Sequence, residues 1–191
     1  LVDELRMIGM ELVSKNAEVP RGILGQGIDQ DEEEPRPPDV AEELVAQADA
    51  VQLRRGLGDR QALGLSLRWL SRVYWWAGAR PEAEASGIEA IEILADGDDW
   101  RALGLALSNQ SQLHVLAGRA SEGIAVGERA VSMARQIGDP GLLSHAPNNV
   151  GFAHWDQRRP QGRVLLEESL AVDLDAGEVE HACRAYVNIV W

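Results

Sequence analysis

Apolar residues recur along the chain with the spacing of amphipathic helices, and the whole pattern repeats about every 40 residues. The apolar stretch 62–67 returns as 102–107, and the turn with Gly78 that follows the first stretch returns as a turn with Gly118. A period of this length indicates helix pairs that stack on one another, because one pair cannot bury its apolar faces alone. We therefore predict an all-α fold built from stacked antiparallel helix pairs.

The repeat divides residues 40–191 into successive units. These are a half-unit 40–59, three units 60–98, 99–139 and 140–178, and a partial unit 179–191. We expect turns at 77–81, 96–99, 117–121, 138–140, 157–161 and 176–178, and no strand. Pro147 occupies an interior position of a predicted helix. Because an interior proline removes a backbone donor and clashes with the preceding turn, we expect this helix to be kinked or to begin late.

The first 39 residues do not follow the repeat. Apolar residues at Leu1, Leu5, Ile8 and Leu12 predict an amphipathic helix over 1–15, either isolated or capping the array. Residues 16–39 are rich in proline, glycine and acidic residues, so we interpret them as a flexible acidic linker. The chain starts at Leu1 and stops in mid-pattern, and we expect it to be part of a longer protein.

Charge and composition restrict the classes of function. The formal net charge is −13, which argues against direct nucleic-acid binding because the phosphate backbone requires a basic face. A single cysteine, Cys183, excludes an internal disulfide and is typical of a reducing compartment, so we predict a cytoplasmic location. No apolar run reaches the roughly 20 residues of a membrane-spanning helix, so we expect no membrane association.

Small residues recur at equivalent positions in the units and would let neighbouring helices approach closely. They are Ser71, Ser111 and Gly151 in one position, Ala83 and Gly123 in a second, and Ala90 and Ala130 in a third. An aromatic-sized residue follows the first position at Tyr74, His114 and His154. Because the three share one slot, we interpret both histidines as packing groups.

With Gly78 and Gly118 at the turns, this pattern resembles the tetratricopeptide repeat (TPR) over residues 40–191. The roughly 40-residue version is similar to that of large actinobacterial LuxR-type and STAND-ATPase regulators. The resemblance implies a right-handed α-α superhelix whose first helices line a concave groove, within a signalling or transcriptional regulator. The ATPase and helix-turn-helix domains of those regulators are not in this sequence.

Helical spacing selects the side chains that would face such a groove. They are Arg68, Arg72, Trp75, Trp76, Ser108, Asn109, Gln112, His145, Asn148, Asn149, Phe152, Trp155, Arg184 and Asn188. Asn109, Asn149 and Asn188 lie one unit apart, and each amide offers the donor and the acceptor that match a peptide unit. We predict that this ladder holds an extended peptide. The alternative is that these asparagines bond to neighbouring helices, and the two interpretations are equally supported.

The sequence offers little for catalysis or metal binding. Glu178 and His181 have the Glu-x-x-His spacing of a di-iron bundle, but no second copy exists. His181 and Cys183 lack a third ligand nearby. We therefore predict no enzyme activity, no cofactor and no metal site.

Two classes of function remain open. The first is a protein-interaction scaffold that binds a peptide or another domain of the same protein in its groove. The second is an effector sensor with a closed apolar pocket of about 300–1,000 Å³ lined by Trp75, Trp76, Phe152 and Trp155. A homodimer is compatible with both. For the first class, we expect Asn149→Ala to weaken binding by about 1–2 kcal/mol with little change in thermal stability.

Overall fold

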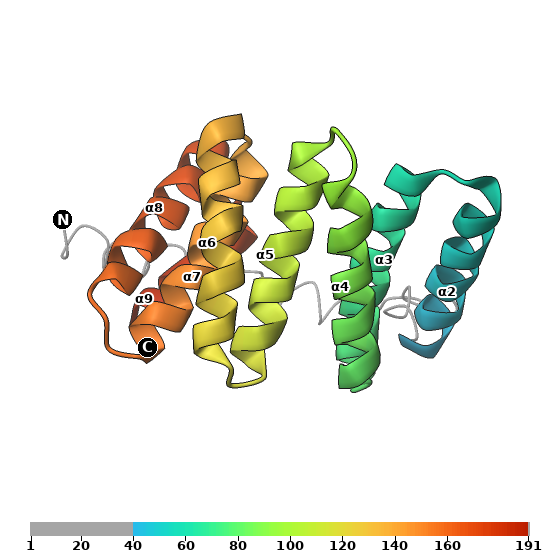
Figure 1. Cartoon of the computed structure of the whole chain (residues 1–191). Coiled ribbons are helices and arrows are strands. Elements are labelled where there is room, and N and C mark those ends of the chain that lie inside the picture. Colours follow the sequence, from blue (N-terminus) through green and yellow to red (C-terminus); the bar gives the residue numbers. More distant parts are fainter. Residues whose placement is uncertain (1–39, 191) are drawn as a thin grey trace, which may run out of the picture.

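The computed structural model describes residues 40–190, which form an array of eight α-helices (Figure 1). The helices are α2 (Val40–Leu57), α3 (Arg60–Trp76), α4 (Arg80–Ala95), α5 (Trp100–Leu116), α6 (Ala120–Ile137), α7 (Pro140–Asp156), α8 (Gln161–Ala176) and α9 (Val179–Val190). No strand occurs in this range, so the predicted all-α class is confirmed. The predicted helix over 1–15, the linker 16–39 and Trp191 lie outside the described residues.

Aspartate caps set the start of three helices that begin successive units. The side chains of Asp59, Asp99 and Asp139 accept hydrogen bonds from the backbone N–H groups of residues 62, 102 and 142 at 2.9–3.0 Å. Each aspartate satisfies a donor that the first helical turn leaves without a partner. Glycine precedes two of them, and Gly138 ends α6 in the left-handed conformation at φ 70°. The recurring Gly-Asp pair therefore both ends one helix and begins the next.

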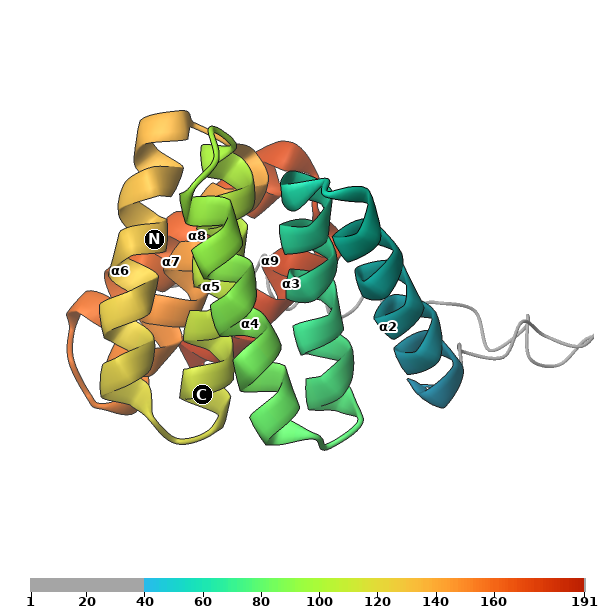
Figure 2. The same ribbon diagram turned by 45° about the vertical axis from the view of Figure 1, so that its right-hand side comes forward.

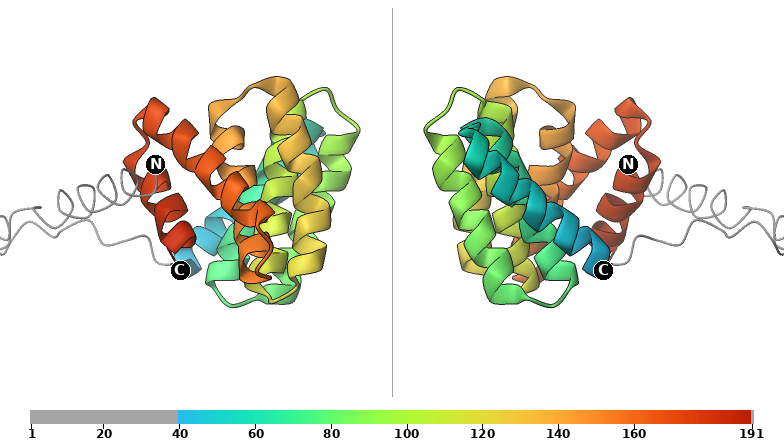
Figure 3. Two further views of the ribbon diagram at one scale, coloured as in Figure 1. Left: turned by 90° about the vertical axis from the view of Figure 1, so that its left-hand side faces the viewer. Right: turned by 90° about the vertical axis from the view of Figure 1, so that its right-hand side faces the viewer.

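The helices pack as antiparallel pairs whose first members form an inner layer. α3 packs on α4, α5 on α6 and α7 on α8, while α3, α5, α7 and α9 contact one another in succession. Figure 2 shows α7 and α9 behind α6 and α4, with α3 beside α4. In the end-on views of Figure 3, α9 lies on the side of the array opposite to α4 and α6. Side chains of the four first helices therefore share one inner face.

Small residues allow the close helix crossing within each pair. Ser71 Oγ donates to the carbonyl oxygen of Ala83, and Ser111 Oγ donates to that of Gly123, both at 2.7 Å. In the third pair glycine replaces the serine, and a Cβ at Gly151 would lie 3.0 Å from the carbonyl oxygen of Gly162. The predicted role of this position, close backbone approach, is confirmed.

Two buried clusters form most of the core. One joins units through Leu107, Val131, Leu142 and Val150, and the other through Leu67, Leu94 and neighbouring small residues. Each cluster contains side chains from more than one pair. The core is therefore continuous along the array, as stacked repeats require.

The structure decides against one of the two expectations for Pro147, the late start of its helix. α7 begins at Pro140 and continues past Pro147 to Asp156, so the helix does not begin late. Pro140 lies in the first turn, where a missing N–H costs little. Pro147 is buried among the packed helices. Tertiary packing stabilises the helix across this proline.

None of the helices in residues 40–190 combines the length and the apolar character needed to cross a lipid bilayer.

Candidate functional site on the inner face

The inner face carries a small pocket where α5, α7 and α9 meet. Its volume is about 190 Å³. The lining residues are Gln112, Val115, Leu116, Asn148, Asn149, Phe152, Arg184 and Asn188. Six of these were predicted to face a groove, and they come from three helices that are far apart in sequence. The helical spacing thus selected side chains that the fold brings together.

One hydrogen-bond network joins α5 to α7 behind this pocket. Asn149 Nδ2 donates to the backbone oxygen of Ser108 at 3.1 Å and to Ser108 Oγ at 3.2 Å. His145 Nδ1 lies 2.7 Å from Ser108 Oγ and 3.3 Å from Asn149 Nδ2. Because an amide nitrogen only donates, His145 Nδ1 is the acceptor in the second contact. Ser108 and Asn149 are both buried, so this network holds two units together.

The other two asparagines of the ladder also bond within the array. Asn109 Nδ2 donates to Ser71 Oγ at 3.3 Å, and the residue is 0% exposed. Asn188 Nδ2 donates to Asn148 Oδ1 at 2.8 Å from a half-buried position. Each amide therefore contacts the preceding unit, which is the alternative to peptide binding. Of the three, only Asn149 and Asn188 line the inner pocket, and Asn109 does not.

Three arginines place positive charge on the inner face. Arg68 and Arg72 are half-buried on α3, and Arg184 is half-buried on α9. The Nε atoms of all three are buried and have no hydrogen-bond partner in the described part of the chain. Burial lowers the pKa of each guanidinium, and the charge of Arg72 further lowers the pKa of both Arg68 and Arg184. Charges on α3 and α9 thus lie close enough to repel each other.

His145 lies in this positive environment and stays neutral. Burial lowers its pKa well below the ordinary value of 6.5, and the charges of Arg184, Arg72 and Arg68 lower it further, followed by His181. A neutral ring agrees with the accepting role of Nδ1. His145 therefore presents a hydrogen-bonding group to the inner face without adding charge.

The structure separates the tryptophans predicted to line one site. Trp76 is 54% exposed and meets Trp69 edge-on, with 6.0 Å between ring centroids. Arg72 Cζ lies 5.5 Å from the Trp69 ring centroid and 5.4 Å from that of Trp76. Trp75 instead contacts Arg80, whose Cζ lies 4.6 Å from its ring centroid. Grouping Trp75 with the inner face was wrong, because adjacent residues on a helix point in different directions.

Trp155 lies at a third place. With Phe152, Asp156 and Arg158 it lines a cavity of about 510 Å³, whereas Trp75 borders a cavity of about 90 Å³ with residues of α4 and α5. Of the four aromatic residues predicted as the lining of an effector pocket, Phe152 and Trp155 therefore share one cavity, Trp75 borders another, and Trp76 lines neither of them.

The shared aromatic slot holds packing groups, as predicted for His114. That ring is 8% exposed and accepts from Arg119 Nε at 3.2 Å. His154 is half-buried, and burial followed by the charge of Arg159 lowers its pKa. Within residues 40–190 no three His, Cys, Asp or Glu side chains are grouped to bind a metal ion.

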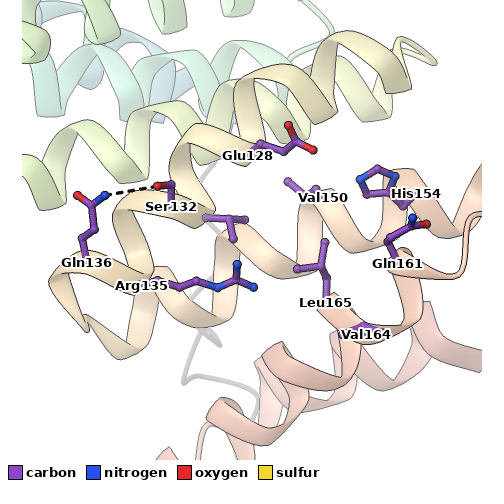
Figure 4. Close-up of a pocket in the computed structure, with 10 residues that line it drawn as sticks. Glu128, Ser132, Arg135, Gln136, Val150, His154, Gln161, Val164 and Leu165 are labelled. Carbon is purple, nitrogen blue, oxygen red and sulfur yellow. Dashed lines mark hydrogen bonds between the residues drawn. The ribbon is translucent and has the colours of Figure 1, made fainter.

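The sequence analysis missed a larger groove on the outer side, between α6 and α8 over α7 (Figure 4). Its volume is about 690 Å³. Its lining comprises Glu128, Val131, Ser132, Arg135, Gln136, Val150, His154, Gln161, Val164 and Leu165. Val164 is 65% exposed, and an apolar residue on an otherwise polar face was the one local signal. The gap itself depends on the separation of α6 from α8, which the repeat pattern does not encode.

No protein-family model matches the chain, and a search of curated proteins found no match either.

Proposed function

We propose that this chain is a non-catalytic, TPR-like interaction scaffold that binds a peptide or a partner domain on its inner face. The observation that carries the proposal is the pocket where α5, α7 and α9 meet. It combines the polar side chains of Gln112, Arg184 and Asn188 with the apolar Leu116 and Phe152. Such a mixture suits a peptide, whose backbone needs hydrogen-bond partners and whose side chains need apolar contact.

The volume of the pocket favours a peptide over an enclosed effector. About 190 Å³ is below the roughly 300–1,000 Å³ typical of small-molecule sites. A ligand of this face would therefore extend beyond the pocket along the inner layer, toward Arg72 and Trp76 on α3. We place the chain in a cytoplasmic signalling or transcriptional regulator, on the basis of its resemblance to the repeats of such proteins.

A second candidate function is effector sensing at the cavity of Phe152 and Trp155. Its volume of about 510 Å³ lies within the range of small-molecule sites, and two aromatic rings line it. Quenching of tryptophan fluorescence by a small molecule that is lost in Trp155→Ala would favour this function.

Selection of peptides from a random display library on the full chain tests the first proposal. Gln112 and Asn188 are half-buried inner-face residues, and we expect Gln112→Ala and Asn188→Ala to weaken peptide binding several-fold while the fold persists. Gln136→Ala, in the outer groove, is the matched control and should bind normally. Peptides whose affinity drops in Gln136→Ala but not in the inner-face variants would contradict the proposal.

A further inference from the structure

Two ends of the helix array bring arginines together on the inner face. Arg68 and Arg72 come from α3, and Arg184 comes from α9, which lies behind α3 in the view of Figure 2. All three have a buried Nε atom that has no hydrogen-bond partner among residues 40–190. The charge of Arg72 also lowers the pKa of Arg184. In a chain with a formal net charge of −13, this is a concentrated positive site.

Within residues 40–190, these guanidinium groups have no carboxylate partner of the kind that other arginines have. Arg60 pairs with Asp96 at 2.6 Å, Arg101 with Asp139 at 2.7 Å and Arg135 with Glu168 at 2.7 Å. Those pairs are exposed on the surface. No carboxylate of residues 40–190 forms an ion pair with the three inner arginines.

Two carboxylates, Asp173 and Glu180, raise the pKa of Arg184 through their negative charge. Neither forms an ion pair with it. Arg184 Nε and Nη2 are both buried, and neither has a hydrogen-bond partner from Val40 to Val190; the same holds for Arg68 Nε and Arg72 Nε. A buried charge without a hydrogen-bonding counter-ion is costly, and mutual repulsion adds to the cost. The site is therefore arranged for an anion that comes from outside the folded array.

The surroundings of the arginines position them for such a ligand. Arg72 lies against the rings of Trp69 and Trp76, which favours one orientation of its guanidinium. Trp69 Nε1 in turn donates to Glu43 on α2 at 3.2 Å. His145, uncharged between the two ends, adds no further repulsion. The Arg72 guanidinium is thus held by aromatic neighbours rather than by a carboxylate.

We propose that Arg72 and Arg184, assisted by Arg68, bind a phosphoryl oxyanion on the inner face. This inference rests on the proposed role of that face in ligand binding and specifies the chemistry of the ligand. Guanidinium groups bind phosphate through paired N–H donors. A phosphoryl group carries nearly two negative charges and three acceptor oxygens, so it compensates several arginines where a carboxylate compensates one. The group belongs to a phosphorylated small molecule or to a phosphorylated side chain.

Titration of the full chain with inorganic phosphate tests this site. Ionic strength is held constant with potassium chloride, and binding is followed by the melting temperature and by tryptophan fluorescence, since Trp69 and Trp76 adjoin Arg72. We expect saturable binding by the wild-type chain. Arg72→Gln and Arg184→Gln should each reduce phosphate affinity at least about tenfold, because each removes paired charge-assisted hydrogen bonds. Arg60→Gln, the same change at an exposed and paired arginine, should leave it unchanged.

Two further measurements separate binding from folding. Without phosphate, Arg72→Gln and Arg184→Gln should melt no lower than wild type, because each removes a repelled charge. Arg184→Lys keeps the charge without the fork, so it should retain part of the affinity. A phosphate response that persists in Arg72→Gln and Arg184→Gln would overturn the proposal, and so would an equal response to potassium chloride.

Three more arms identify the source of the oxyanion. Citrate that binds more tightly than phosphate would overturn the phosphoryl assignment in favour of carboxylates. A second arm uses a variant that combines four changes: Asp31→Asn, Glu32→Gln, Glu33→Gln and Glu34→Gln. If phosphate binds only to this variant, carboxylates of the chain itself are the ligand of the arginines, which would overturn the phosphoryl assignment. A phosphopeptide that binds more tightly than phosphate, by contacts that Asn188→Ala weakens, would support a phosphorylated side chain. Peptide binding without any phosphate response would contradict this inference alone and leave the proposed scaffold function standing.

Discussion

At the scale of single residues, the inner face consists of two kinds of polar side chain. One kind forms hydrogen bonds between units. Asn109 and Asn149 are 0% and 6% exposed, and their side-chain amides donate to residues of α3 and α5, respectively. The other kind, which includes Gln112 and Arg184, is half-buried and lines the pocket. Burial therefore separates the residues that hold units together from the residues that line the pocket.

Asn149→Ala tests the first kind. The change deletes the hydrogen bonds to Ser108 inside the fold, so we expect the free energy of unfolding to fall by about 1–3 kcal/mol. Our expectation from sequence, a loss of binding with little change in stability, does not agree with this burial. Urea denaturation measures the difference. Gln112→Ala, on the same face but half-buried, should change stability by less than about 0.5 kcal/mol. Equal stability of Asn149→Ala and wild type would contradict the structural role.

His145 predicts a dependence of stability on pH. Its pKa is lowered in the folded chain, so the unfolded chain binds more protons below pH 6.5. Stability should therefore fall as the pH drops below about 6.5, by at most about 1.4 kcal/mol per pH unit for this group. Thermal melts between pH 7.5 and 5.5 measure the effect, and His145→Gln should reduce it.

Other titratable groups determine the pH dependence of stability that remains in His145→Gln. His154, whose pKa is also lowered, adds a dependence of the same sign. Asp173 acts in the opposite sense, because burial raises its pKa above 3.8 and its protonation favours the folded chain. Unchanged pH dependence in His145→Gln would contradict the assignment.

At the scale of helices, the distance between paired elements is limited by small residues at their crossings. A Cβ at Gly162 would collide with the backbone nitrogen of Trp155 and lie 2.6 Å from the carbonyl oxygen of Gly151. Backbone atoms cannot move aside as a flexible side chain does. The crossing of α7 and α8 therefore requires glycine at this position.

Two glycine-to-alanine variants test this limit against helix propensity. Alanine favours a helix over glycine by up to about 1 kcal/mol. Gly56, in α2, has open space around its Cβ position, so Gly56→Ala should stabilise the chain slightly. Gly162→Ala should lower the free energy of unfolding by about 1–3 kcal/mol, because overpacking outweighs propensity. Chemical denaturation of both variants provides the comparison, and stabilisation by Gly162→Ala would show that the crossing is looser than described.

At the scale of the whole molecule, the array brings its first described units and its last helix into electrostatic contact. Neither α3 nor α9 packs on the other, yet Arg72 acts on Arg184. The approach is produced by the successive packing of α3, α5, α7 and α9. The electrostatic interaction between Arg72 and Arg184 thus depends on every helix crossing between α3 and α9.

A double-mutant cycle on Arg72 and Arg184 measures this approach. Each single change to glutamine removes the same mutual repulsion, so the double variant should gain less stability than the two gains added together. We expect a coupling energy of about 0.5 kcal/mol or more at low salt. It should shrink in 0.5 M sodium chloride, because salt screens charges. Strict additivity at low salt would contradict the proximity of the two groups.

The sequence by itself determined the helices, since the signals that begin and end them are local. The all-α class followed from the 40-residue period, the Gly-Asp turns and the small residues at crossings. The predicted turns coincide with the observed turns or include them. The same spacing also predicted six residues of the inner pocket, because helical geometry alone assigns them to one side of a helix.

Only the tertiary structure decided which of those residues hold units together and which line a cavity. It buried Asn109 and Asn149 in contacts between units, separated Trp75 from Trp76, and opened the outer groove between α6 and α8. It also brought the charge of Arg72 close enough to Arg184 to lower the pKa of that residue. These outcomes depend on crossing angles that accumulate over four units, and each angle depends on side chains from two helices. A local pattern of residues does not specify the accumulated crossing angle.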